Sequence, residues 1–206
     1  MATEAQWKIA ILAALLRLRQ LACDVRLVDP AFDGDSTKIA RVVELATQIA
    51  REGSRVLVFS QFTQFLTKIR DALSASGLRV GYLAGETPTP KRRAIVDEFQ
   101  SGALDVFCVS LLAGGTGLNL TAASYVIHTD PWWTPAVEEQ ATSRAHRMGQ
   151  TQPVTVYRLV SRGTIEEAVL QMHASKRQLA EAVLQGQGTA TAVTPAELMA
   201  LLRFEG

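Results

Sequence analysis

Short apolar segments typical of β-strands alternate with amphipathic helical segments along most of this chain, and no other feature constrains the fold as strongly. Strands that alternate with helices need crossover connections, which favour a mostly parallel sheet covered by helices on both faces. The sequence therefore predicts an α/β fold. The expected strands are residues 55–59, 79–83, 104–109, 124–130 and 154–159, and the expected helices between and after them are residues 61–74, 87–99, 134–146 and 164–184.

Helical segments flank this alternating region on both sides. Apolar residues at helical spacing predict an N-terminal helix over residues 4–22, and a turn-rich connector over 29–36 leads to a helix over 37–51. After Gln185 the composition changes to a linker, and Thr194 to Glu197 has the form of a capping box that starts a short apolar helix. We expect three parts: an N-terminal helix and connector over residues 1–35, the main lobe with its trailing helix over 36–185, and a linker with a short helix over 186–206.

Composition excludes several classes of protein. The 206 residues are 48% hydrophobic, which is enough for one full domain with a substantial core. The formal net charge of +1 means that any nucleic-acid binding must rely on a local basic patch. Cys23 and Cys108 are too few for a disulfide framework, and the apolar run from Ile9 to Leu16 is too short to span a bilayer. We expect an intracellular, non-membrane protein.

Four loops leave the carboxyl ends of the expected strands, where α/β sheets bind their ligands. The third contains Gly114, Gly115 and Gly117, and glycine-rich loops let backbone amides approach a phosphate closely. We expect the loops to converge on one edge of the sheet. They are residues 60–62, 84–87, 110–117 and 131–134.

Gln140, Arg144 and Arg147 recur at helical spacing, so all three can project from one face of a helix. Two guanidinium groups three residues apart form a fork that suits phosphate oxygens, in the manner of arginine fingers. The alternative is that the arginines form surface salt bridges with Glu138 or Glu139. Spacing alone favours the alternative, and the surrounding residues reverse that preference.

Four segments of the sequence form one set: RVLVFSQF, LAGETPTPKRRAIVDEF, SLLAGGTGLNLTAA and DPWWTPAVEEQATSRAHRMGQTQPVTVYRLV. Together they resemble the Swi/Snf-type ATPases, helicase-like DNA translocases of superfamily two, and specifically their C-terminal RecA-like lobe. The similarity covers roughly Leu16 to Arg177, and the residues around Trp132 resemble those of bacterial members. The resemblance implies a RecA-like sheet with flanking N-terminal and C-terminal helices.

In such ATPases the nucleotide lies between two lobes, and the second lobe contributes arginines that stabilise charge on the γ-phosphate. The resemblance implies that Arg144 and Arg147 are these catalytic fingers and that Gln140, Gly115 and Gly117 line the ATP site. The cofactors it implies are ATP and Mg²⁺, both held mainly by the first lobe. The three histidines and two cysteines are scattered and show no metal-ligand spacing. Asp97-Glu98 is similar to an acidic motif that positions Mg²⁺, but its segment has helical rather than strand periodicity, so we do not expect a metal site there.

The resemblance also implies contacts to the phosphates of double-stranded DNA, and it directs Trp133 into the minor groove while Trp132 packs in the core. Lys91, Arg92 and Arg93 form either a solvated helix face or a phosphate patch. Such contacts are blind to sequence, as a translocating motor requires. The expected DNA-binding residues are Ser60, Gln61, Gly85, Thr87, Ser110, Gly114 and Trp133.

The phosphate-binding motif G-x-x-x-x-G-K-[ST] does not occur in the chain, so it cannot hold the β- and γ-phosphates of ATP by itself. We therefore expect one half of a DNA-dependent ATPase, inactive alone, whose partners are the first lobe, double-stranded DNA and a DNA-bound protein target. It would act at the nucleoid in a bacterium or in the nucleus of a eukaryote. The alternative is a non-catalytic module, derived from such a lobe, that binds DNA or a partner.

Overall fold

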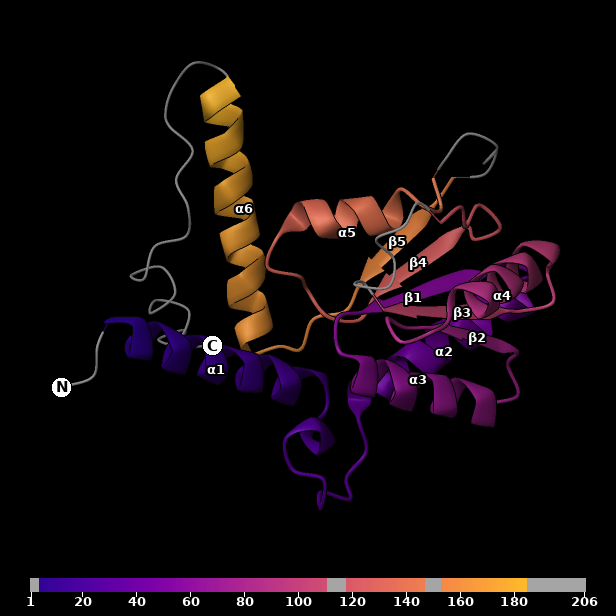
Figure 1. Ribbon diagram of the computed structural model, residues 1–206, viewed down its shortest axis with the longest axis horizontal. Coiled ribbons are helices and arrows are strands. Elements are labelled where there is room, and N and C mark those ends of the chain that lie inside the picture. The colour runs from indigo at the N-terminus through magenta and orange to yellow at the C-terminus, as the bar shows by residue number, and fades with distance from the viewer. Residues whose placement is uncertain (1–3, 111–117, 147–152, 185–206) are drawn as a thin grey trace. The chain divides into compact units, whose positions relative to one another are not determined.

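The computed structural model describes residues 4–110, 118–146 and 153–184 and divides the chain into two compact units (Figure 1). One unit comprises residues 33–159, and the other combines residues 1–32 with residues 160–206. The expected linker and short helix over residues 186–206 lie outside the described residues, and the expected three-part division stays a prediction.

The unit of residues 33–159 is built on a five-stranded sheet in which every pair of neighbouring strands is parallel. The strand order is β2-β3-β1-β4-β5, so each connection crosses a face of the sheet. This confirms the predicted α/β class with a parallel sheet. The strands are β1 (Val56–Ser60), β2 (Val80–Leu83), β3 (Val106–Ser110), β4 (Tyr125–His128) and β5 (Thr155–Arg158).

Helices cover both faces of this sheet. Helices α2 (Thr37–Arg51) and α3 (Thr63–Ala75) pack against each other on one face. Helices α4 (Thr89–Ser101) and α5 (Pro135–Thr142) contribute to a core cluster on the other, and Figure 1 shows α5 and α3 on opposite sides of the strands. Successive strand residues point to opposite faces. The side of α4 and α5 accordingly receives Leu57, Phe59, Phe107, Val109 and Val126, all buried.

The helix expected over residues 134–146 ends earlier, at Thr142, and this is a correction to the prediction. After that residue the backbone tightens: the Arg144 amide donates to the Ala141 carbonyl, and the Ala145 amide donates to the Thr142 carbonyl. The Arg144 carbonyl in turn accepts a hydrogen bond from the Leu120 amide at 3.0 Å. The Arg144 carbonyl is thus bonded to a distant segment of the chain instead of to a further turn of α5.

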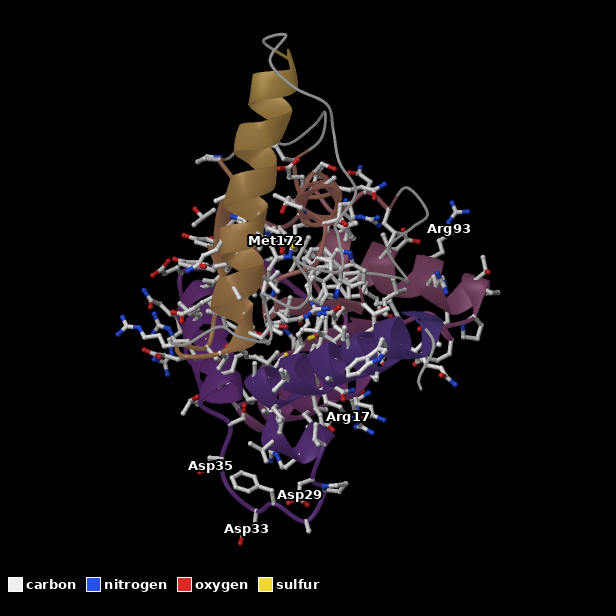
Figure 2. The ribbon with its side chains drawn as sticks, turned by 90° about the vertical axis from the view of Figure 1, so that its left-hand side faces the viewer. Arg17, Asp29, Asp33, Asp35, Arg93 and Met172 are labelled. Atoms are coloured by element: carbon white, nitrogen blue, oxygen red, sulfur yellow. The ribbon has the colours of Figure 1, made fainter. Side chains whose placement is uncertain are left out.

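The second unit joins the two ends of the chain. It contains α1 (Glu4–Cys23), a short 3₁₀ helix η1 (Val25–Leu27) and α6 (Ile165–Leu184), and Arg17 projects from the exposed side of α1 (Figure 2). The Ser161 hydroxyl donates to the Ala22 carbonyl at 2.8 Å, and the Ser161 amide donates to the buried Glu166 carboxylate at 2.8 Å. Among the described residues, no helix has the length and hydropathy needed to cross a bilayer.

Candidate functional site

The loops that were expected to converge leave the same edge of the sheet. In the strand register Ser60 at the end of β1 faces Ser110 at the end of β3, and Leu83 faces Val109. On the other side of β1, Phe59 faces His128 at the end of β4. The prediction of convergence is therefore confirmed for the loops after β1, β2 and β4. The loop after β3, with Gly114, Gly115 and Gly117, lies outside the described residues.

Ser60 is fully buried, and its hydroxyl holds its own loop. The hydroxyl donates to Asp130 Oδ1 at 2.5 Å and accepts a hydrogen bond from the Phe62 amide at 3.1 Å. The Gln61 amide donates to Asp130 Oδ2 at 3.3 Å. Ser60 and Ser110 are thus buried at the carboxyl ends of their strands, at most 1% exposed, and Gln61 and Phe62 after Ser60 are half-buried.

Asp130 was not identified from the sequence, although it organises this part of the edge. It is 2% exposed and lies two residues after β4. Besides its partners after β1, it accepts a hydrogen bond from the Thr129 hydroxyl at 3.0 Å. The signal that could have revealed it is an acidic residue placed directly between a buried strand and a proline, where a solvated side chain is not expected.

The paired tryptophans occupy the turn that follows Asp130. Trp132 packs against the apolar core cluster, which confirms its expected role, whereas Trp133 is half-buried. The Trp132 amide donates to Oε1 of Glu138, a residue that is 2% exposed on α5, at 2.8 Å. Oε2 of Glu138 accepts a hydrogen bond from Arg158 Nε at 2.8 Å, so Glu138 forms an ion pair with Arg158 on β5.

The loop after β2 is held by one member of the basic cluster. The Thr87 hydroxyl accepts a hydrogen bond from the Ala84 amide at 3.1 Å. The Arg92 guanidinium donates to the carbonyls of Thr87 and Gly85, each at 2.6 Å. Lys91 and Arg93 are exposed, and Figure 2 shows Arg93 directed away from α4. We expected Arg92 to be either solvated or part of a phosphate-binding patch. Instead, its guanidinium binds the loop after β2 and fixes the position of that loop.

The expected nucleotide-facing residues differ in their surroundings. Gln140 is exposed on α5, and Arg144 is 7% exposed in the turn after that helix. Because α5 ends at Thr142, these two residues do not share one continuous helical face as the spacing predicted. Arg147 lies outside the described residues. Within the described ranges, no group of three or more histidine, cysteine or carboxylate side chains is placed to hold a metal ion.

Two buried titratable groups of the core keep their neutral forms. Burial lowers the pKa of His128 from 6.5 to about 4, and its imidazole stacks on Phe59 with ring centroids 5.5 Å apart. The Nε2 atom of His128 lies 3.0 Å from the Thr142 hydroxyl. Burial also raises the pKa of the Cys108 thiol to about 12. Both neutral side chains lie buried within the core.

Comparison with known proteins gives consistent matches. The model of the helicase conserved C-terminal domain matches residues 37–149. The chain is 41% identical over 168 residues to the chromatin-remodeling ATPase INO80 of Cryptococcus neoformans, covering 81% of this chain and 10% of that protein. It is 38% identical over 203 residues to the putative ATP-dependent helicase/translocase YwqA of Bacillus subtilis, covering 95% of this chain and 22% of YwqA.

A solved structure shows the same arrangement. The Sulfolobus solfataricus SWI2/SNF2 ATPase core in complex with double-stranded DNA superposes with a TM-score of 0.74 and 35% identity, covering 86% of this chain and 38% of that one. The chain therefore spans between a tenth and about a fifth of the length of these curated relatives and less than half of this solved core.

Proposed function

This chain belongs to the family of helicase conserved C-terminal domains, as found in SNF2-type ATPases, and from that premise we propose that it is the second motor lobe of an ATP-dependent double-stranded DNA translocase. The observation that carries the proposal is the 35% identity to the DNA-bound SWI2/SNF2 core, in a match that covers 86% of this chain. The first lobe, encoded in the same longer protein, would be its partner, and a DNA-bound protein would be its target.

In this proposal the nucleotide is held by the first lobe, and this chain completes the site when the lobes close. Arg144 and Arg147 would donate hydrogen bonds to oxygens of the γ-phosphate, beside Gln140, Gly115 and Gly117. Magnesium ATP supplies the phosphoryl group whose charge these guanidiniums stabilise. Two observations support this division between the lobes: the sequence has no phosphate-binding P-loop, and Gln140 is exposed on α5.

The burial of Arg144 also fits a finger. The Arg144 carbonyl accepts a hydrogen bond from the Leu120 amide, and the residue is 7% exposed, so its side chain can adopt few rotamers. Donors that are already oriented before the reaction lose little free energy to reorganisation when charge develops. A flexible surface arginine would have to be ordered first, at a cost in conformational entropy.

DNA would bind along the carboxyl edge of the sheet. The amide-bearing loops at Gln61, at Gly85 to Thr87 and at Ser110 to Gly114 would follow the phosphates of one strand, and Trp133 would enter the minor groove. The buried Ser60 hydroxyl would act indirectly, by orienting the Gln61 and Phe62 amides. A Cβ added at Gly85 would meet nothing within 4 Å, so this backbone is open to an approaching phosphate.

The proposal is tested by comparing ATP hydrolysis by the full-length protein with hydrolysis by this 206-residue chain alone. The full-length protein should be stimulated at least about tenfold by double-stranded DNA, and the isolated chain should not exceed the background rate, because it lacks the P-loop. Measurable DNA-stimulated turnover by the isolated chain would sink the proposal. A full-length protein that binds DNA without hydrolysing ATP would instead favour the non-catalytic module.

A further inference from the structure

Two buried carboxylates hold the two ends of the turn that carries Trp132 and Trp133. Asp130 precedes the turn and Glu138 follows it, and each is 2% exposed. A buried carboxylate is costly unless hydrogen bonds compensate for its lost hydration, and apolar residues often give equal or greater stability. We therefore expect these two residues to fix the position of the turn rather than to increase the free energy of unfolding. We refer to Asp130 and Glu138 as the carboxylate clamp.

Asp130 joins segments that lie 70 residues apart in the chain. Its Oδ1 accepts hydrogen bonds from the hydroxyls of Ser60 and Thr129, and its Oδ2 accepts one from the Gln61 amide. The Thr129 hydroxyl also lies within hydrogen-bonding distance, 3.0 Å, of the Phe59 carbonyl. The loop after β1 and the start of the tryptophan turn are consequently parts of one hydrogen-bonded unit.

Glu138 fixes the same turn from its other end. Its Oε1 accepts the hydrogen bond from the Trp132 amide, and its Oε2 binds Arg158 on the edge strand β5. The side chain of Arg158 is 46% exposed, whereas that of Glu138 is 2% exposed. Glu138 is thus anchored to the sheet on one side and holds the backbone just before Trp133 on the other.

We propose that the carboxylate clamp consists of positioning residues that fix Trp133 relative to the amides of Gln61 and Phe62, so that the indole and the amides meet one stretch of DNA as a rigid pair. Fully satisfied buried polar networks have one good arrangement, which suits them to this purpose. The DNA role of the clamp rests on the proposed function, whereas the mechanical link between the two segments rests on the hydrogen bonds alone.

The test uses Asp130→Asn in the full-length protein. Whichever way the new amide is turned, its NH₂ group faces the Gln61 amide or the two hydroxyls that donated to Asp130, so at least one donor loses its acceptor. Hydrogen–deuterium exchange without DNA should become about tenfold faster in two separate peptides, residues 60–62 and residues 131–134. The concentration of double-stranded DNA that gives half-maximal ATPase activity should also rise about tenfold, while kcat at saturating DNA changes less than about twofold.

Three further variants make the result specific. Asp105→Asn, which alters a carboxylate at the opposite edge of the sheet, should leave both readouts unchanged. Combining Ser60→Ala with Asp130→Asn should give about the same rise in half-activating DNA concentration as Asp130→Asn alone, because partners in one network are not additive. Glu138→Gln should affect the exchange of residues 131–134 only, with about a threefold rise in half-activating DNA concentration.

Faster exchange in only one of the two peptides would overturn the mechanical link. Faster exchange in both peptides with an unchanged half-activating DNA concentration would show that the clamp does not position these segments for DNA binding. A wild-type protein whose ATPase activity is not stimulated by DNA would overturn both the proposed function and the role of the clamp in DNA binding. The exchange measurement would still test the mechanical link between the loop after β1 and the tryptophan turn.

Discussion

A carboxylate lies at each edge of the central sheet, and the two differ in burial and in hydrogen bonding. At the amino edge the Asp105 side chain is 21% exposed and pairs with Arg79, which is 59% exposed, and the Arg79 guanidinium holds the pKa of Asp105 below its ordinary value. At the carboxyl edge Asp130 is 2% exposed and accepts hydrogen bonds from Ser60, Thr129 and Gln61. A solvated pair contributes little to the free energy of unfolding and tolerates many geometries. A buried network is stable in one geometry only, which marks the carboxyl edge as the one whose shape matters.

The largest expected effect separates these two carboxylates directly. Asp130→Ala should lower the free energy of unfolding of this chain by about 3 kcal/mol, because it leaves buried donors without acceptors. Asp105→Ala should lower it by about 1 kcal/mol or less, because water replaces the lost partner. Urea denaturation followed by circular dichroism measures both values. Equal losses would remove the distinction between the edges.

A second prediction concerns His128, at the end of β4. Its folded-state pKa is depressed to about 4 from 6.5, so the unfolded state takes up the proton first as the pH falls. The contribution of neutral His128 to the free energy of unfolding is present above about pH 6.5 and is lost as the pH falls toward about 4. Between about pH 7 and about pH 5 the free energy of unfolding should decrease by about 2 kcal/mol. His128→Gln should flatten this part of the stability profile. An unchanged slope in the variant would show that His128 is not the titrating group.

The smallest expected effect compares two glycines on either side of the end of β2. A Cβ at Gly81 would lie 2.7 Å from Leu104 Cδ1, so Gly81→Ala should cost about 1 kcal/mol in overpacking. Gly85→Ala, in open space, should change the free energy of unfolding by less than about 0.5 kcal/mol. In the full-length protein only Gly85→Ala should raise the DNA concentration needed for half-maximal ATPase activity. If Gly81→Ala raised it equally, the loop after β2 would lose its distinct role.

Local signals in the sequence were sufficient for most of the fold. The predicted start of α2 is confirmed by the Ser36 hydroxyl, which accepts a hydrogen bond from the Ile39 amide at 3.3 Å. Alternation of apolar segments located all five strands to within a few residues. The end of α5 could not be predicted in this way, because the contact between Leu120 and Arg144 depends on the tertiary fold rather than on the residues near Thr142.

The candidate site was harder to predict than the fold. The sequence identified the loops, and it assigned Trp132 to the core correctly. It did not identify Asp130, and it considered Glu138 only as a surface partner of the arginines, because an acidic residue normally lies in solvent and only the strand register brings Ser60 beside Asp130. Spacing also could not separate Arg92, which holds the loop after β2, from its exposed neighbours. The roles proposed for Gln140, Arg144 and Arg147 rest on the family resemblance and stay predictions.

The central claim is that this lobe completes an ATP site held by another lobe, and the most direct test is the DNA-stimulated kcat of the full-length protein carrying Arg147→Ala or Arg144→Ala. Each variant should lose about a thousandfold or more in kcat at saturating DNA, with the affinity for ATP within a few-fold of wild type, because a finger acts mainly on the transition state. Melting temperatures close to that of the wild type would establish that the variants fold. A kcat within about tenfold of wild type in both variants would contradict the claim.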